Sequence, residues 1–143
     1  MQVTAIIAEW NPLHRGHLLP VQAARQQGAT HIVAILSGNF VQRGEPALCP
    51  WQYRAAAALS SGVDLVLLLP LPYAVSTAQH FAGGAVASLA ALGAVDSLIF
   101  GSECGELAAL RSVAAALDSP DLPAALAPHL QKGLPFAAAR QAA

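Results

Sequence analysis

Two histidines in the string HRGH offer the clearest chemistry in this sequence. His14 and His17 lie directly after a short apolar run and at the start of an alanine-rich stretch. Imidazoles at the start of a helix can donate hydrogen bonds to phosphate oxygens, and the helix N-terminus adds unpaired N–H groups and a partial positive charge. Such donors stabilise the charge that develops around a phosphorus atom during transfer. We predict that both histidines are catalytic; two surface histidines at a helix start are the alternative.

The residues around the two histidines fit a phosphate-binding loop. Gly16 lets the backbone approach a phosphate, because glycine has no Cβ atom. Pro12 restricts the loop, and the side chain of Asn11 can bind backbone groups. The spacing therefore predicts a loop that joins a strand to a helix and holds a phosphate.

Four short apolar runs, rich in Val, Ile or Leu and without polar alternation, are typical of strands that are buried on both faces. They are Val3–Ala8, His31–Leu36, Asp64–Leu69 and Val95–Phe100. Alanine-rich stretches between them predict helices, each followed by a glycine that would end it. These stretches are 16–27, 51–61 and 76–92, with Gly28, Gly62 and Gly93 after them. The order predicts an α/β fold, a Rossmann-like three-layer α/β/α domain with a parallel sheet.

Polar residues follow each predicted strand. The segments are AEWNPLHRGH, SGNFVQRGEPA, PLPYAVSTAQH and GSECGE. The carboxyl ends of parallel strands lie along one edge of the sheet, where open α/β folds bind their ligands. The sequence therefore places one binding site at this edge.

The longer strings resemble a known family. IIAEWNPLHRGH is similar to the signature of the HIGH-type nucleotidyltransferase superfamily. Together with SGNFVQRGEPA, DLVLLLPLPYA, FAGGAV, LGAVDSLIFGSE and GLPFAAAR, it resembles the bacterial tRNA(Met) cytidine acetate ligases over essentially the whole chain. The resemblance implies ATP-dependent activation of acetate to acetyl-adenylate, followed by N4-acetylation of the wobble cytidine of elongator tRNA(Met). It also implies ATP as substrate, with Mg²⁺ expected because the phosphates need charge neutralisation.

The resemblance also implies site residues. The loop 7–20 would bind ATP, His14 and His17 would contact its phosphates, and Gly101 would bring backbone close to the adenine or the ribose. The residues expected to bind ATP are Ile7, Ala8, Glu9, Asn11, Pro12, His14, Gly16, His17, Gly101 and Ser102. Contacts to phosphate or to a second substrate are expected from Asn39, Gln42, Arg43, Glu103 and Arg140.

Several of these assignments have structural alternatives. Arg43 could instead pair with Glu45 on the surface, where an ion pair contributes little. Ser102 and Glu103 could meet a ribose or Mg²⁺, or simply cap a helix. The aromatic residues at 51–54, where a helix is predicted to start, are expected to cover the hydrophobic core rather than to stack on nucleic-acid bases.

The sequence departs from the family pattern at two positions. Leu68 and Gln79 stand where members usually carry glutamates. Either the two glutamates interact with each other in the family and were lost together, or this chain handles its substrate differently.

Composition limits the remaining possibilities. With 143 residues, 55% of them hydrophobic and 10% charged, the chain suits a single domain over residues 1–143. The pattern at the end of the chain indicates a part of a longer protein, and the resemblance implies that this protein has a C-terminal tRNA-binding part. A net charge of −1 without a basic cluster gives this portion no marked nucleic-acid surface. We expect a cytoplasmic protein without a membrane segment, with Cys49 and Cys104 reduced.

Two other functions remain open at this point. A small-molecule adenylyltransferase, of the phosphopantetheine or nicotinamide-mononucleotide type, would suit the chain length. A nucleotide-binding module without catalysis would suit the departures at Leu68 and Gln79. Release of pyrophosphate with different acceptors distinguishes all three hypotheses.

Overall fold

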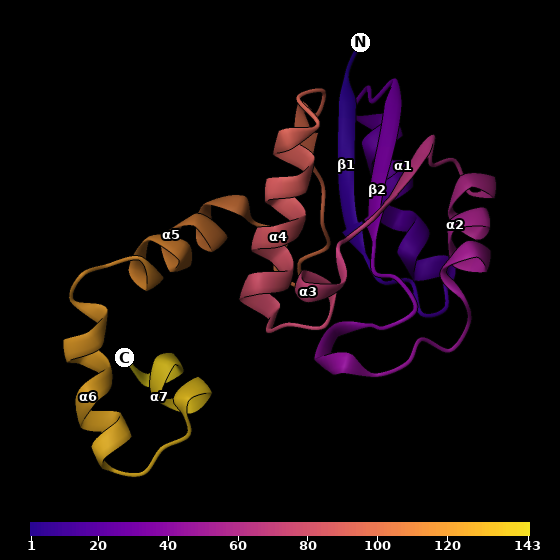
Figure 1. The fold of residues 1–143 in the computed structure, drawn as a ribbon. Helices are drawn as coiled ribbons and strands as arrows, with labels where there is room; N and C mark the ends of the chain where they lie inside the picture. The colour runs from indigo at the N-terminus through magenta and orange to yellow at the C-terminus, as the bar shows by residue number, and fades with distance from the viewer. The chain divides into compact units, whose positions relative to one another are not determined.

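The computed structural model describes all residues, Met1–Ala143, and divides into two compact units. The first unit is Met1–Gly101 and the second is Ser102–Ala143 (Figure 1). A sheet with helices forms the first unit, and three helices form the second. Each unit is compact in itself, and the expectation of a single domain over residues 1–143 stays a prediction.

A parallel sheet forms the centre of the first unit. Its strands are β1 (Val3–Ala8), β2 (His31–Leu36), β3 (Leu65–Leu68) and β4 (Ser97–Leu98), in the order β3-β2-β1-β4. The first two strands have the predicted bounds. The other two are shorter than the predicted runs, but backbone hydrogen bonds continue one residue beyond both ends of each. The predicted parallel α/β sheet is confirmed.

Helices cover both faces of this sheet. They are η1 (Arg15–His17) and α1 (Leu18–Gln26), η2 (Gln42–Gly44), α2 (Trp51–Ser60), α3 (Leu71–Ala74) and α4 (Ala78–Ala91). Buried residues of α1 and α2 pack in one cluster with β1 and β2, and buried residues of α3 and α4 pack in a second cluster with the same strands. The predicted three layers are therefore present.

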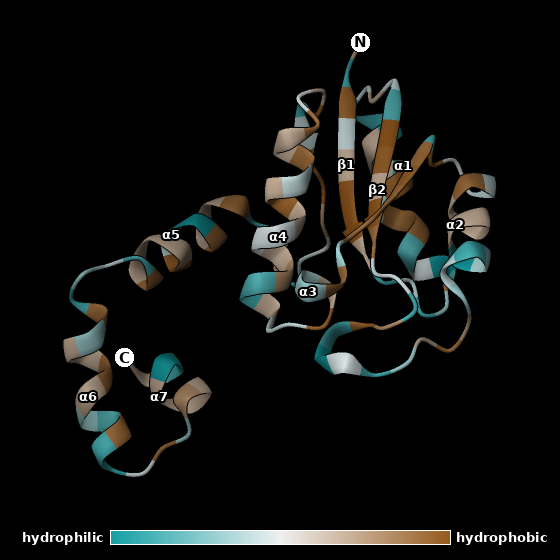
Figure 2. Ribbon diagram, in the orientation of Figure 1, coloured by the Kyte–Doolittle hydropathy of each residue, from teal (hydrophilic) through white to brown (hydrophobic).

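The two clusters explain why the strands show no polar alternation. Ile32, Ala34 and Leu36 of β2 belong to the cluster with α1 and α2, whereas Val33 and Ile35 belong to the cluster with α3 and α4. Successive side chains point to opposite faces, and both faces are covered. Figure 2 shows the result as strands that are mostly hydrophobic along their length.

The predicted helix stops are confirmed. Gly28, Gly62 and Gly93 have φ values of 94°, 101° and 67°, which glycine adopts without a steric penalty. Helix α3 was not predicted, because prolines punctuate its sequence. Pro70 precedes its first turn and Pro72 lies within that turn, where a missing N–H costs no helical hydrogen bond.

The second unit contains α5 (Leu107–Leu117), α6 (Leu122–Gln131) and α7 (Phe136–Ala142). Helix α6 contains two prolines. Pro123 lies in its first turn, and Pro128 is inside the helix. None of the helices in either unit has the length and apolar character needed to cross a membrane.

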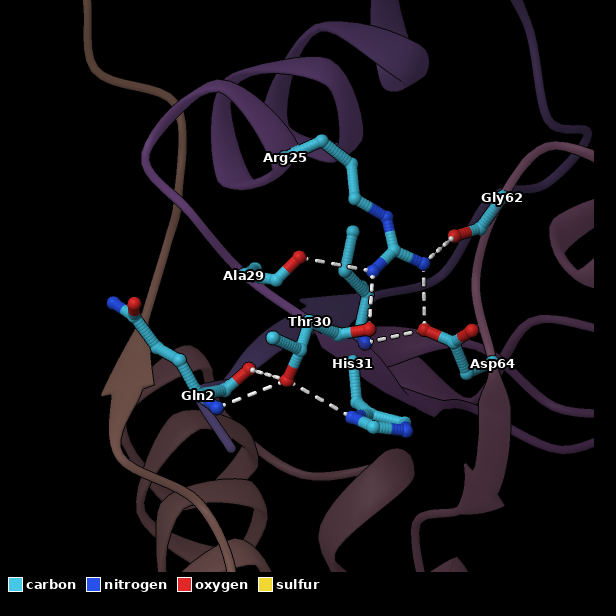
Figure 3. Close-up of polar contacts among 8 residues, drawn as sticks. Gln2, Arg25, Ala29, Thr30, His31, Gly62 and Asp64 are labelled. Atoms are coloured by element: carbon cyan, nitrogen blue, oxygen red, sulfur yellow. Dashed lines mark hydrogen bonds and ion pairs between the residues drawn. The ribbon is translucent and has the colours of Figure 1, made fainter.

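A polar network joins the elements at the amino ends of β2 and β3 (Figure 3). The Arg25 guanidinium, from the end of α1, donates to the carbonyl oxygens of Ala29, Thr30 and Gly62 and forms an ion pair with Asp64. The Asp64 carboxylate also accepts the Ile32 N–H at 2.6 Å. This network fixes the helix-to-strand connections at the edge of the sheet opposite the carboxyl ends of the strands.

Helix α4 approaches Tyr73 of α3 so closely that only glycine fits at one position. A Cβ atom on Gly84 would lie 2.7 Å from Tyr73 Cβ and closer still to its ring, whereas a Cβ on Gly83 would meet nothing within 4 Å. We expect Gly84→Ala to lower the free energy of unfolding by about 1–3 kcal/mol through overpacking. Gly83→Ala should raise it by about 0.5–1 kcal/mol, because alanine favours the helix. Urea unfolding measures both, and equal effects of the two substitutions would contradict this packing.

Candidate active site

A cavity of about 700 Å³ opens at the carboxyl end of β1. The loop after β1, the loop after β2 and the segment after β4 surround it, all within the first unit. Its lining residues are Ile6, Ile7, Ala8, Glu9, Trp10, Asn11, Gly16, His17, Pro20, Val41, Gln42, Arg43, Glu45, Phe100 and Gly101. The site therefore lies at the edge of the sheet where the sequence placed it.

Most of the residues expected to bind ATP meet at this cavity. Those that line it are Ile7, Ala8, Glu9, Asn11, Gly16, His17 and Gly101. Gln42 and Arg43, from the second predicted set, line it as well. Pro12, His14 and Asn39 are not among the lining residues. Ser102, Glu103 and Arg140 belong to the second unit, and their roles stay predictions.

The two histidines form a stacked pair. Their ring centroids are 3.6 Å apart, with 25° between the ring planes. The Gly16 N–H donates to His14 Nδ1 at 3.1 Å, and the His14 N–H donates to His17 Nδ1 at 3.3 Å. The His17 N–H donates to the His14 carbonyl oxygen at 2.9 Å. The N–H groups of Gly16 and His17, which the sequence indicated as free for a phosphate, thus serve the loop itself.

These bonds set the tautomer of the neutral form of both rings. A ring nitrogen that accepts an N–H bond carries no proton, so the neutral imidazole holds its proton on Nε2. His14 and His17 are then Nε2–H donors while their Nδ1 atoms hold the loop. Gly16 permits the arrangement, because a Cβ at this position would lie 3.1 Å from His14 Cε1.

The environment of His17 favours its neutral form. Partial burial is the larger cause, and the neighbouring His14 ring adds a charge repulsion; both lower the pKa of His17. At neutral pH, His17 therefore acts as a neutral hydrogen-bond donor at the cavity wall.

Two asparagine side chains organise the loops. Asn11 Oδ1 accepts the Leu48 N–H at 2.7 Å, so the predicted bond from Asn11 to backbone is present, with a partner far along the chain. Asn39 Oδ1 accepts the Trp51 N–H at 3.2 Å and thereby caps the first turn of α2. The Oδ1 atom of Asn39 is therefore engaged in the loop structure.

Arg54 is a buried residue of this site whose role was missed from the sequence. Its side chain is 1% exposed and its guanidinium reaches the loops after β1 and β2. The sequence treated this position only as part of a helix start with aromatic residues. The sequence held one signal for its burial: Arg54 is four residues before the buried Ala58 and therefore lies on the same face of the helix.

Arg43 adopts an unusual backbone conformation at the cavity. Its φ of 72° lies in the left-handed region, which side-chain-bearing residues rarely adopt. Arg43 forms no ion pair with Glu45, since the ion pair of this structure joins Arg25 to Asp64. The alternative in which Arg43 and Glu45 form a surface pair is therefore wrong for this conformation, and the Arg43 cation lines the cavity unpaired.

Of the aromatic residues at the start of α2, only one covers the hydrophobic core. Trp51 packs against the cluster under α1 and α2, as predicted, whereas Tyr53 is 71% exposed. Leu68 lies at the end of β3, 41% exposed, and Gln79 lies exposed in the first turn of α4. Both cysteines are free thiols, as expected.

Comparisons with known proteins agree with the fold and show the family. The sequence matches the model of the family HIGH Nucleotidyl Transferase over residues 1–143. A tRNA(Met) cytidine acetate ligase of Caldanaerobacter subterraneus subsp. tengcongensis is 48% identical over 146 residues, which cover 100% of this chain and 36% of that protein. One from Syntrophotalea carbinolica is 48% identical over 98% of this chain and 34% of that protein.

A solved structure is similar to nearly the whole of this chain. It is the crystal structure of Thermotoga maritima TmcAL bound with alpha-thio ATP, with a TM-score of 0.90 and 41% sequence identity. The match covers 98% of this chain and 35% of that one. This chain thus spans about a third of the length of the relatives it matches.

The stacked histidines predict a pH-dependent stability. Because the pKa of His17 is lowered by folding, the unfolded chain takes up a proton near pH 6.5 that the folded chain does not. The contribution to stability is present in full above about pH 6.5 and decreases as the pH falls through that value. Protonation of Nδ1 would also displace the His14 N–H. We expect the free energy of unfolding, measured in urea between pH 7.5 and 5.5, to fall less steeply in His17→Asn.

A residue without a titratable group provides a control for this experiment. Gln22 lies at an exposed position of α1. Gln22→Ala should keep the pH slope of the parent protein. If His17→Asn keeps that slope too, the lowered pKa of His17 does not contribute to stability.

Proposed function

Because the chain belongs to the HIGH Nucleotidyl Transferase family, we propose that its cavity binds ATP and activates acetate as acetyl-adenylate. The observation that carries the proposal is the stacked histidine pair, in which His17 lines the cavity at the carboxyl end of β1. The match to ligases of tRNA(Met) cytidine supports acetate as the acid and a tRNA cytidine as the acceptor.

The proposed chemistry places the histidines at the α-phosphate. An acetate oxygen attacks the α-phosphorus, the bond to the β-phosphate oxygen breaks, and pyrophosphate leaves. Negative charge builds on the α-phosphate oxygens during this step, and the Nε2–H groups of His14 and His17 donate to them. Donors that are already oriented need no rearrangement during the reaction, which is the basis of this kind of catalysis.

The loop residues have proposed binding roles. Ile7, Ala8 and Glu9 continue β1 into the cavity and contact ATP, with Asn11 beside them. Gly101, where a Cβ would meet nothing within 4 Å, leaves room for the adenine or the ribose. Gln42 and Arg43 approach from the loop after β2, and Arg43 supplies a cation for pyrophosphate or acetate.

The second step would transfer the acetyl group to RNA. The N4 amine of the wobble cytidine of elongator tRNA(Met) attacks the acetyl carbon, AMP leaves, and the amine loses a proton. We propose that surfaces outside residues 1–143 bind most of the tRNA, because this portion has a net charge of −1.

Mg²⁺ is proposed to accompany the nucleotide. No group of three His, Cys, Asp or Glu side chains is placed to hold a metal ion. The carboxylates at the cavity are those of Glu9 and Glu45, and Glu9 already accepts the Gln42 N–H at 2.6 Å. A cation carried on the ATP phosphates, where it neutralises charge, fits this arrangement better than a cage of protein ligands.

Trapping of the adenylate tests the proposed function. The protein is incubated with ATP, labelled acetate and hydroxylamine, which converts an acetyl-adenylate into acetohydroxamate. We expect labelled hydroxamate together with one pyrophosphate for each hydroxamate. Pyrophosphate release with phosphopantetheine or nicotinamide mononucleotide, and none with acetate, would instead favour a small-molecule adenylyltransferase. Binding of ATP without turnover of any acceptor would favour a module that lacks catalysis.

Substitution of His17 tests the catalytic assignment. Removal of one oriented donor commonly lowers a rate by about 10²–10³-fold, so His17→Ala should lower hydroxamate formation by that factor. Gln22→Ala, at an exposed position of α1, is the matched control and should leave the rate unchanged. A rate for His17→Ala within about two-fold of the parent rate would remove His17 from the proposed mechanism.

A further inference from the structure

Arg54 lies behind the cavity and holds its two main loops together. The Nη1 atom donates to the Glu9 carbonyl oxygen at 2.5 Å, in the loop after β1. The Nη2 atom donates to the Ser37 carbonyl oxygen at 3.0 Å and to the Gly38 carbonyl oxygen, in the loop after β2. One planar side chain therefore fixes the separation of two loops that come from neighbouring strands.

The remaining bonds of Arg54 complete this arrangement. The Nε atom donates to the Cys49 carbonyl oxygen at 3.3 Å, and Nη1 also reaches Ser37 Oγ at 3.4 Å. No carboxylate lies within ion-pair distance of the guanidinium, since the ion pair of this chain is Arg25–Asp64. Backbone carbonyl oxygens thus hold a buried cation, which is costly to bury unless its donors are satisfied.

The loops that Arg54 joins carry the cavity wall. Glu9 lines the cavity, and its carboxylate accepts the Gln42 N–H at 2.6 Å, so it is held at both its carbonyl and its side chain. Gln42 and Arg43, a few residues after Gly38, line the same cavity. A change in the separation of these loops would move Glu9 relative to Arg43, although Arg54 itself does not line the cavity.

We propose that Arg54 is a positioning residue for the nucleotide: its guanidinium sets the distance between the loops after β1 and β2 at which ATP fits. The inference rests on the proposed function, because it takes ATP as the ligand of the cavity. The role depends on the planar fork of donors, which lysine cannot reproduce with its single ammonium group.

Isothermal calorimetry with ATP and Mg²⁺ tests the proposal on the whole chain. Small displacements of binding groups have large effects, so we expect Arg54→Lys to weaken ATP binding by roughly ten-fold or more although it keeps the charge. Arg54→Gln, which keeps some donors but loses the charge, should bind no better than Arg54→Lys. ATP binding by Arg54→Lys equal to that of the parent would overturn the positioning role.

Gly84→Ala separates positioning from a loss of stability. This substitution strains the contact between α4 and Tyr73 of α3, and neither Gly84 nor Tyr73 lines the cavity. We expect Gly84→Ala to lower the unfolding midpoint and to keep the parent affinity for ATP. If Gly84→Ala weakens ATP binding as much as Arg54→Lys at equal stability, Arg54 acts only through stability and the inference fails.

A second variant keeps the test decisive if Arg54→Lys does not fold. Arg54→Gln buries no charge, so it avoids the cost of an unpaired buried cation, but its shorter side chain cannot bind the carbonyl oxygens of both loops. Unchanged ATP affinity in Arg54→Gln would then contradict the proposal. A parent protein that binds no ATP at all would reject the proposed function itself, whereas the results for the variants judge only Arg54.

Discussion

The site depends on how the chain satisfies its backbone groups where the parallel strands end. Beyond Ala8 and Leu36 the ladder between β1 and β2 stops, and the loops that follow carry N–H and C=O groups without sheet partners. Side chains replace the ladder: Arg54 binds carbonyl oxygens, and Glu9 and Asn11 accept N–H groups. Polar bonds from distant positions thus define the shape of the cavity.

Alanines allow the helices to lie close to the sheet. Ala55 and Ala58 of α2 are buried in the cluster on one face, and Ala85 of α4 is buried in the cluster on the other face. Small side chains allow short distances between helix and sheet, so a guanidinium on α2 can reach the ends of two strands. The high alanine content that the sequence shows as composition therefore has a geometric consequence at the site.

The sequence predicted the architecture well because its signals are local. Apolar runs identified β1 and β2 to the residue, and glycines such as Gly28 and Gly62 ended the helices as expected. The omission of α3 has a physical cause. Prolines concealed this helix, because the first turn of a helix tolerates a residue without an N–H group.

The site was predicted less completely, because its bonds join residues that are distant in the chain. The HRGH string identified His17, but nothing in it showed that the Nδ1 atoms would accept backbone N–H groups. The role of Arg54 was missed since its partner Glu9 lies 45 residues away. Asn39 was expected to contact phosphate or a second substrate, which stays a prediction, and the sequence did not show that its Oδ1 would cap α2. Spacing shows residue types near a site and does not show which of their atoms are already engaged.

The charge arrangement follows from the same bonds. His17 is kept neutral by burial and by the His14 ring, and the Arg54 charge is surrounded by carbonyl oxygens. Arg43 is the cation at the cavity wall, and Glu9 and Glu45 oppose it there. The lining therefore has little net positive charge with which to attract an anion from a distance. The proposed binding of a triphosphate in such a cavity would depend on donors with fixed directions, so the position of each loop would matter more than the number of basic residues.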